Sequence, residues 1–223
     1  MTEQVKRIAD AVHQITSKLP PNVHLVAAAK TRTLAEVEVV IEAGVTWIGY
    51  NYIQEALPII EAVGNRAQWH MIGHLQRNKA RFAAESFDMV QTIDSWRLAK
   101  YLDDRCRLLQ RKMPVLIEIN SGRESSKTGV LPKDVDALVE KMSTLNHLQV
   151  QGLMTMGPRF GDPEDSRPYF KLTRQAFDRL GSLNAPNIEM KYLSMGMSNS
   201  YRVAIEEGAN IIRIGTQLFG ERE

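Results

Sequence analysis

The sequence contains one cysteine, no long hydrophobic run and almost no net charge. Cys106 has no second cysteine to pair with, which favours a reducing compartment. No apolar run approaches the roughly 20 residues of a membrane span, and the opening MTEQVKRIADAVHQ lacks the core of a signal peptide. Lysine plus arginine number 28 against 26 for aspartate plus glutamate, and a net charge of +2 argues against a dedicated nucleic-acid-binding protein. These absences predict a cytoplasmic protein outside the membrane.

The composition is that of an ordinary globular chain. The 223 residues are 43% hydrophobic and 24% charged, which excludes a disordered, collagenous or coiled-coil protein. The chain has no segment with the composition of a linker or of low complexity. We therefore expect residues 1–223 to form a single domain with one sizeable core.

Short apolar runs alternate with amphipathic segments along the whole chain. Apolar residues recur every three or four positions from Val5 to Leu19, which predicts a first helix that stops at Pro20 and Pro21. Eight predicted strands follow, each separated from the next by a predicted helix. They are HLVAAAK, WIGYN, AQWHMIGH, DMVQTID, VLIEIN, LQVQGLMTM, IEMKYLSMG and NIIRIG.

Two helix starts have capping signals. Thr33 followed by Glu36 predicts a capping box at the start of the second helix, and Gly44 suits its end. Asp94 is expected to cap the helix that runs through Leu109.

Strictly alternating strands and helices predict parallel strands joined by crossover helices. Eight such units predict a (β/α)8 TIM barrel preceded by an N-terminal helix, and a doubly wound open sheet is the alternative. We expect a monomer, because no long exposed apolar stripe is left once the barrel is built.

In a barrel of this kind, functional residues lie where the strands end. Lys30 ends the run Val26–Ala29, so its amine is expected in an apolar barrel mouth. Burial disfavours the ammonium form, and a neutral amine can attack an aldehyde to form a Schiff base. The alternative is a lysine that only leaves the core for solvent.

The loops after the seventh and eighth strands read SMGMSNS and RIGTQ. Gly196 and Gly215 let backbone N–H groups approach an anion, and Ser194, Ser198 and Thr216 supply hydroxyl donors. Barrels often bind phosphate with these two loops. Together with a strand-end lysine they predict a site for a phosphorylated aldehyde, for which pyridoxal 5′-phosphate is the obvious candidate. Ordinary caps and turns are the alternative for either loop alone.

Arg213 lies on the last predicted strand, two residues before Gly215. A guanidinium donates hydrogen bonds but cannot accept a proton, so a contact with a pyridine nitrogen would keep that nitrogen unprotonated. Such a ring is a weaker electron sink than one paired with a carboxylate. A salt bridge inside the barrel is the alternative.

The sequence resembles the pyridoxal-phosphate homeostasis protein family, whose fold is like the N-terminal barrel of alanine racemase. The resemblance is carried in order by AAAKTR, GYNYIQE, WHMIGHLQRNK, INSGRESSKTG, GLMTM, YLSMGMS and IRIGTQLFGER. It implies a Schiff base between pyridoxal phosphate and Lys30, and Arg213 against the pyridine nitrogen. It further implies a pocket lined by Asn51 and His74, and a phosphate held by Ser194, Gly196, Ser198, Gly215 and Thr216.

The chain departs from the family at two positions. The family usually has glutamate where Tyr50 stands and aspartate where Ser200 stands, so two carboxylates expected near the pocket are missing. The resemblance implies a role in vitamin B6 and amino- and keto-acid homeostasis, without a robust catalytic activity.

A racemase-like enzyme is the alternative. Racemisation needs an acid/base group on each face of the bound substrate. Lys30 can serve one face, and alanine racemase supplies the other as a tyrosine with the help of an additional β-domain. We expect that domain to be absent here, although Tyr50 or Tyr52 could substitute.

Three further hypotheses about functional sites have weaker support. His70 and His74 have the spacing of a zinc pair, but no cysteine or carboxylate neighbour completes the set. Cys106 is expected to be inert. A basic segment around Arg77, Lys79 and Arg81 is expected to be a solvated helix face, with docking on client apoenzymes or contact with RNA as the alternatives.

Overall fold

Eight parallel strands close into a barrel in the computed structural model, because β1 pairs with β8 as well as with β2. The structure describes residues 3–124, 127–158, 160–183 and 185–221. Residues 125–126 of the SGRESSKTG segment and 222 of IRIGTQLFGER lie outside this part. The closed order confirms the predicted barrel and excludes an open sheet. The strands are β1 (His24–Ala28), β2 (Trp47–Tyr50), β3 (Gln68–Met71), β4 (Met89–Ile93), β5 (Met113–Ile119), β6 (Leu148–Thr155), β7 (Ile188–Ser194) and β8 (Ile211–Ile214).

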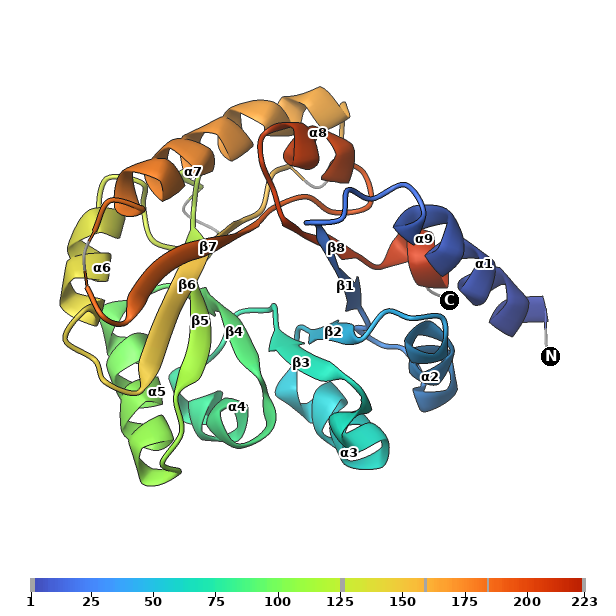
Figure 1. Cartoon of the computed structure of the whole chain (residues 1–223), viewed down its shortest axis with the longest axis horizontal. Helices are drawn as coiled ribbons and strands as arrows, with labels where there is room; N and C mark the ends of the chain where they lie inside the picture. The colour runs from blue at the N-terminus through green and yellow to red at the C-terminus, as the bar shows by residue number, and fades with distance from the viewer. Residues whose placement is uncertain (1–2, 125–126, 159, 184, 222–223) are drawn as a thin grey trace.

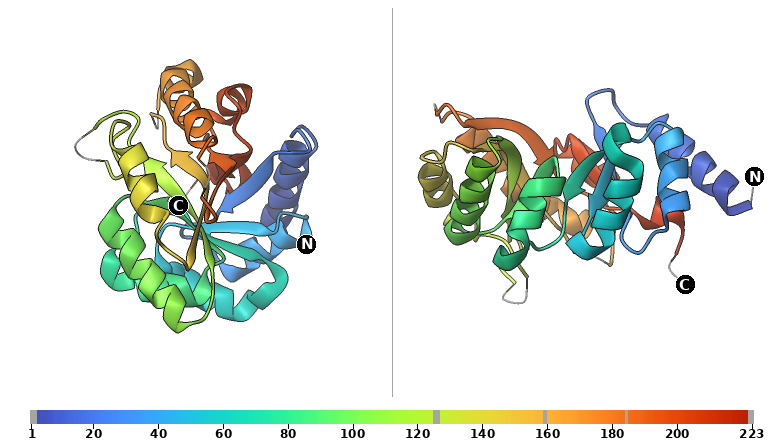
Figure 2. Two further views of the ribbon diagram at one scale, coloured as in Figure 1. Left: turned by 60° about the vertical axis from the view of Figure 1, so that its left-hand side comes forward. Right: turned by 90° about the horizontal axis from the view of Figure 1, so that it is seen from below.

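Helices surround the strands on the outside of the barrel (Figures 1 and 2). The predicted first helix is present before β1, and the predicted helix follows each of the first seven strands. After β8 the chain forms one more helical turn, α9, which the sequence did not predict. The α-helices are α1 (Glu3–Thr16), α2 (Leu34–Glu42), α3 (Ile53–Val63), α4 (Ala80–Ser86), α5 (Trp96–Leu108), α6 (Val135–Met142), α7 (Arg167–Leu180), α8 (Tyr201–Glu206) and α9 (Thr216–Phe219).

The strands bury side chains on both faces. Successive side chains of a strand point to opposite faces, and in β1 Leu25 and Ala27 pack toward the helices whereas Val26 and Ala28 line the barrel interior. Such two-sided burial explains why the predicted strands read as nearly continuous apolar runs. The interior cluster is completed by Ile72, Met89, Leu116, Met154 and Ile211.

The two predicted caps have different outcomes. The Thr33 and Glu36 capping box is confirmed: each side chain bonds the backbone N–H of the other residue. The prediction that Asp94 caps α5 is wrong, because the cap is Ser95, whose hydroxyl accepts from the Leu98 N–H. Asp94 is engaged elsewhere, since its carboxylate accepts from the Ser95 hydroxyl and lies 3.3 Å from Nδ1 of His74.

Helix α1 packs against α2 and α9, so the beginning and the end of the chain lie side by side (Figure 1). The contact includes a hydrogen bond of 2.8 Å from Arg7 to the carbonyl of Phe219. A single turn such as α9 is unstable alone, because helix nucleation costs more than one hydrogen bond returns. Its structure therefore depends on such tertiary contacts.

Candidate functional site

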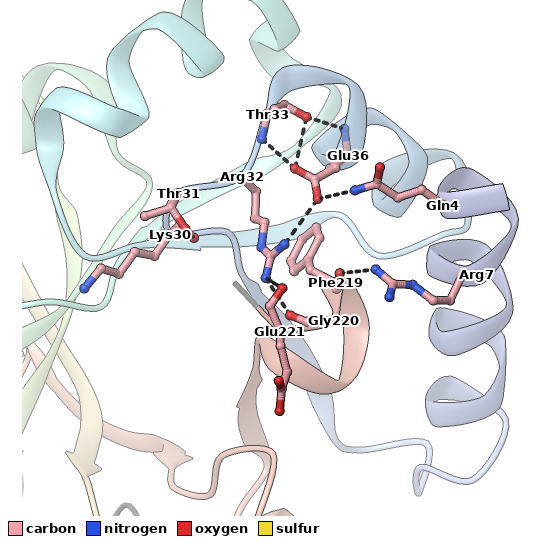
Figure 3. A network of polar contacts seen from close by, with 10 residues as sticks. All are labelled: Gln4, Arg7, Lys30, Thr31, Arg32, Thr33, Glu36, Phe219, Gly220 and Glu221. Carbon is pink, nitrogen blue, oxygen red and sulfur yellow. Dashed lines mark hydrogen bonds and ion pairs between the residues drawn. The ribbon is translucent and has the colours of Figure 1, made fainter. Parts of the chain in front are cut away.

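Lys30 follows β1 at the carboxyl end of the barrel and is half-buried. Its Nζ lies 4.8 Å from the centroid of the Tyr52 ring, within the range of a cation–π interaction. Figure 3 shows the Lys30 side chain pointing away from Arg32. The predicted lysine therefore stands at the barrel mouth beside one aromatic ring.

The residue after Lys30 has an unusual backbone conformation. Thr31 has a φ of +63°, in the left-handed region that β-branched residues rarely adopt. Its N–H donates to Oε2 of Glu55 at 3.0 Å, which ties the segment to α3. Backbone strain of this kind persists only where the surroundings fix it, and it concentrates at functional sites. No sequence pattern indicated it.

The two glycine-containing loops meet at the same end of the barrel. The Arg213 N–H donates to the carbonyl of Gly196 at 3.1 Å, and the Gln217 side-chain amide donates to the carbonyl of Ser198 at 2.8 Å. Gly215 adjoins β1, because a Cβ atom built on it would lie 3.2 Å from the carbonyl oxygen of Ala28. The loops are thus brought together beside the strand that leads to Lys30.

Gly196 is at a position where any side chain would force its neighbours to move. Its φ is +89°, and an added Cβ would lie 2.6 Å from Cβ of Ala204 and 2.7 Å from Cα of Tyr201. Ser198 is half-buried in the same loop, and Thr216 is exposed at the first position of α9. Four of the five residues expected at the phosphate therefore cluster: Gly196, Ser198, Gly215 and Thr216.

Ser194 lies apart from this cluster, in the barrel interior. Its hydroxyl accepts from Nη1 of Arg213 at 2.6 Å and donates to Oε1 of Gln91 at 2.7 Å. The Gln91 amide nitrogen in turn donates to Nδ1 of His70 at 2.9 Å. The single hydroxyl proton of Ser194 is therefore directed at a side chain of the barrel.

Arg213 is almost fully buried and has two protein acceptors. Besides Ser194, it donates to the backbone carbonyl of Thr155 at 2.9 Å. Burial lowers the pKa of its guanidinium to about 10, although the Glu118 carboxylate opposes this, so the group remains charged at neutral pH. Burial also raises the pKa of Glu118, against the hydrogen bond from Thr128. Sequence analysis missed Glu118, Gln91 and Thr155 as partners in this interior.

Asn51 and His74 line a hollow of about 380 Å³ with Tyr52. Gly73 lies against the Asn51 backbone, since an added Cβ would be 2.6 Å from Cα of Asn51. The His74 side chain is 47% exposed and pairs with Asp94 at 3.3 Å. Both predicted residues thus adjoin the Lys30 side of the mouth through Tyr52.

The two departures from the family pattern lie outside this hollow. Tyr50 packs in the layer between strands and helices, and its buried hydroxyl has no hydrogen-bond partner among the described residues. Burial, with the Glu55 and Glu36 carboxylates, raises its pKa. Ser200 is buried in the turn before α8, where its hydroxyl accepts from the Met197 N–H.

The geometry does not support a zinc site, a reactive cysteine or a specialised basic face. His70 lies inside the barrel and His74 at its mouth, and the described residues contain no group of three metal-ligating side chains. Burial raises the pKa of the Cys106 thiol to about 11. Arg77 and Arg81 are exposed, as expected of a solvated face. Within the described ranges no helix is long and apolar enough to cross a membrane.

Comparison with known proteins gives independent evidence on the family and the fold of this chain. The model of the alanine racemase N-terminal domain matches residues 4–223. The pyridoxal phosphate homeostasis protein of Aquifex aeolicus is 39% identical over 200 residues, covering 89% of this chain and 87% of that protein. The structure of PipY from Synechococcus elongatus with PLP bound has a TM-score of 0.87 at 34% identity, covering 96% of this chain and all of that one. Alanine racemase from Bacillus anthracis shares the fold, with a TM-score of 0.77 at 17% identity over 98% of this chain and 56% of that one.

Proposed function

Because this chain belongs to the pyridoxal phosphate homeostasis protein family, we propose that it binds pyridoxal 5′-phosphate covalently on Lys30 and acts as a carrier of that cofactor. The cofactor's aldehyde condenses with a lysine amine, with loss of water, to give a Schiff base. The convergence of the Lys30 strand end with the two glycine-containing loops carries the proposal. A monomeric state, a cytoplasmic location and delivery to client apoenzymes are part of it.

The phosphate would be held by Gly196, Ser198, Gly215 and Thr216. The Gly196 position supports this, since any side chain there would collide with α8 and move the loop. Ser198 is half-buried and Thr216 is exposed, and both hydroxyls lie on loops that hydrogen bonds hold together. We assign Ser194 instead to the support of Arg213, because its hydroxyl proton is used by Gln91.

Arg213 would donate to the pyridine nitrogen. Its guanidinium is charged at neutral pH and is oriented by Ser194 and the Thr155 carbonyl. A donor that never accepts a proton keeps the ring nitrogen unprotonated, which weakens the ring as an electron sink. This supports binding and storage more than carbanion chemistry.

The position of Tyr50 also favours a carrier over a racemase. A second acid/base group must reach the face of the ring opposite Lys30. Tyr50 packs toward the helices and cannot serve, whereas the Tyr52 ring lies beside Nζ of Lys30. The racemase-like alternative would need the Tyr52 hydroxyl to reach the opposite face of the ring.

Two assays separate carrier from enzyme. The loaded protein is mixed with an apoenzyme that needs pyridoxal phosphate, and recovery of that enzyme's activity is compared with free cofactor at the same total concentration. In parallel, single enantiomers of amino acids are incubated with the loaded protein and analysed by chiral chromatography. A carrier reconstitutes the apoenzyme without racemising amino acids. Sustained racemisation that is lost in Tyr52→Phe would instead establish the enzyme.

A further inference from the structure

We propose that Arg32 is a positioning residue that fixes the Lys30 segment relative to α9, and so sets the spacing between the two attachment points of the cofactor. The inference rests on the proposed function, since it assumes that Lys30 binds the aldehyde and that the loop entering α9 binds the phosphate. Arg32 itself would touch neither group. Figure 3 shows the network of contacts that it makes.

The Arg32 guanidinium bridges two elements that are distant in sequence. Nη2 donates to the carbonyl of Gly220 at 2.6 Å, and Nη1 lies 3.3 Å from Oε1 of Glu36. The guanidinium also lies over the Phe219 ring, 5.3 Å from its centroid. The side chain of Arg32 is only 11% exposed, so these contacts are shielded from solvent. A rigid planar fork with several simultaneous partners fixes geometry better than a flexible ammonium would.

Glu36 anchors the other side of the bridge. Its carboxylate accepts from the Thr33 N–H at 2.8 Å and from the Gln4 amide at 3.1 Å. Although burial opposes it, hydrogen bonds from Thr33 and the charge of Arg32 lower the pKa of Glu36, so the carboxylate stays ionised at neutral pH. The partner of Arg32 is thereby fixed to α2 and α1.

Arg32 acts at the end of α9 that is opposite Thr216. The helix has a single turn, capped at Gly215, and two arginines hold its last carbonyls: Arg7 at Phe219 and Arg32 at Gly220. Cations at a helix C-terminus complement the helix dipole. Arg7 and the packing of α1 against α9 hold the helix itself, whereas Arg32 ties its carboxyl end to the segment that carries Lys30.

Only one residue separates Arg32 from Lys30. That residue is Thr31, whose left-handed conformation is held by the hydrogen bond from its N–H to Glu55. The Lys30 backbone is therefore fixed between α3 on one side and the α2–α9 bridge on the other. Loss of the bridge would remove one of these two restraints on the Lys30 backbone.

The expected effect of Arg32 on ligand affinity follows from effective concentration. A ligand attached at two points gains affinity over either half only when the spacing of the two sites matches the ligand. Pyridoxal carries the aldehyde without the phosphate, and pyridoxine 5′-phosphate carries the phosphate without the aldehyde. If Arg32 positions the two sites, its loss weakens the binding of pyridoxal phosphate more than the binding of either half-ligand.

The test compares dissociation constants of the three ligands for wild type, Arg32→Ala, Arg32→Lys and Arg7→Ala. For Arg32→Ala we expect roughly tenfold or greater weakening for pyridoxal phosphate, and less than about threefold for each half-ligand. Arg7→Ala is the matched control, because it also removes a contact to the end of α9 but has no link to Lys30. We expect it to change all three constants by less than about threefold. Arg32→Lys keeps the charge and should give an intermediate loss.

Equal weakening of all three ligands in Arg32→Ala would overturn the proposal, as would no change at all. Thermal melts check that each variant folds, and if Arg32→Ala does not, Arg32→Lys supplies the same comparison of ligands. Failure of the proposed function gives a different result: wild type then binds pyridoxal phosphate no better than pyridoxine 5′-phosphate, and Lys30→Ala leaves both constants unchanged.

Discussion

Nη1 of Arg213 donates a hydrogen bond of 2.6 Å to the hydroxyl of Ser194 inside the barrel. That hydroxyl donates onward to Gln91, and Gln91 donates to His70. A chain of hydrogen bonds therefore runs through the barrel interior from β3 to the arginine that would meet the pyridine ring. Buried networks of this kind fix a unique arrangement only when every member is satisfied.

We therefore expect different roles for Ser194 and Ser198, which alanine variants distinguish. Ser194→Ala removes one buried hydrogen-bond partner from Arg213 and one from Gln91, so we expect the free energy of unfolding to fall by about 1–3 kcal/mol. Ser198→Ala lies in a half-buried loop and should change it by less than about 1 kcal/mol, while weakening pyridoxine 5′-phosphate severalfold. Urea denaturation and ligand titration measure the two quantities. Equal stability of the two variants contradicts the assignment.

Because of His70, we expect the stability of the protein to depend on pH. Burial, with a smaller effect of His24, lowers its pKa from 6.5 to about 3. Between these values the unfolded chain binds a proton that the folded protein does not, so stability falls as pH falls from 6.5 toward 3, by about 1.4 kcal/mol per pH unit. His70→Asn retains an acceptor for Gln91 but has no titrating group. Denaturation of both proteins at pH 7, 6, 5 and 4 should give a steeper loss for wild type; parallel curves would refute the interpretation.

Gly196 and Gly44 form a matched pair. Both have positive φ, +89° and +97°, so alanine at either costs about 1–3 kcal/mol of backbone strain. An added Cβ meets nothing within 4 Å at Gly44 but collides with α8 at Gly196. We expect Gly196→Ala to weaken pyridoxine 5′-phosphate by roughly tenfold or more, about 1.4 kcal/mol. Gly44→Ala should leave that constant unchanged, and a similar loss in both variants contradicts a phosphate site at Gly196.

Tyr50→Phe tests whether this departure from the family pattern is functional. The Tyr50 hydroxyl is buried without a partner among the described residues, so its removal should raise the free energy of unfolding by about 1 kcal/mol. Binding of pyridoxal phosphate should not change, because the side chain faces the helices. Guanidinium denaturation and a ligand titration give both values. A lower stability or a weaker complex would show that the hydroxyl has a role.

The barrel could be predicted from the sequence because it depends on local patterns, and the same patterns led to the proposed site. Apolar runs of strand length alternate with helical periodicity, and Lys30 and the two glycine-containing loops stand where those runs end. The network around Arg213 could not be found in this way, because Ser194 and Gln91 are 103 residues apart and nothing local pairs them. The conformation of Thr31 depends on Glu55 from another helix, and α9 is too short for a periodic signal.

The central claim is a covalent link between pyridoxal phosphate and Lys30. The most direct measurement is the visible absorption spectrum of the purified protein after addition of pyridoxal phosphate, followed by borohydride reduction and peptide mass spectrometry, with Lys30→Ala in parallel. The account predicts a yellow protein whose reduced adduct maps to Lys30, and a variant without the colour or the adduct. A wild-type protein that stays colourless, or an adduct on another lysine, would contradict it.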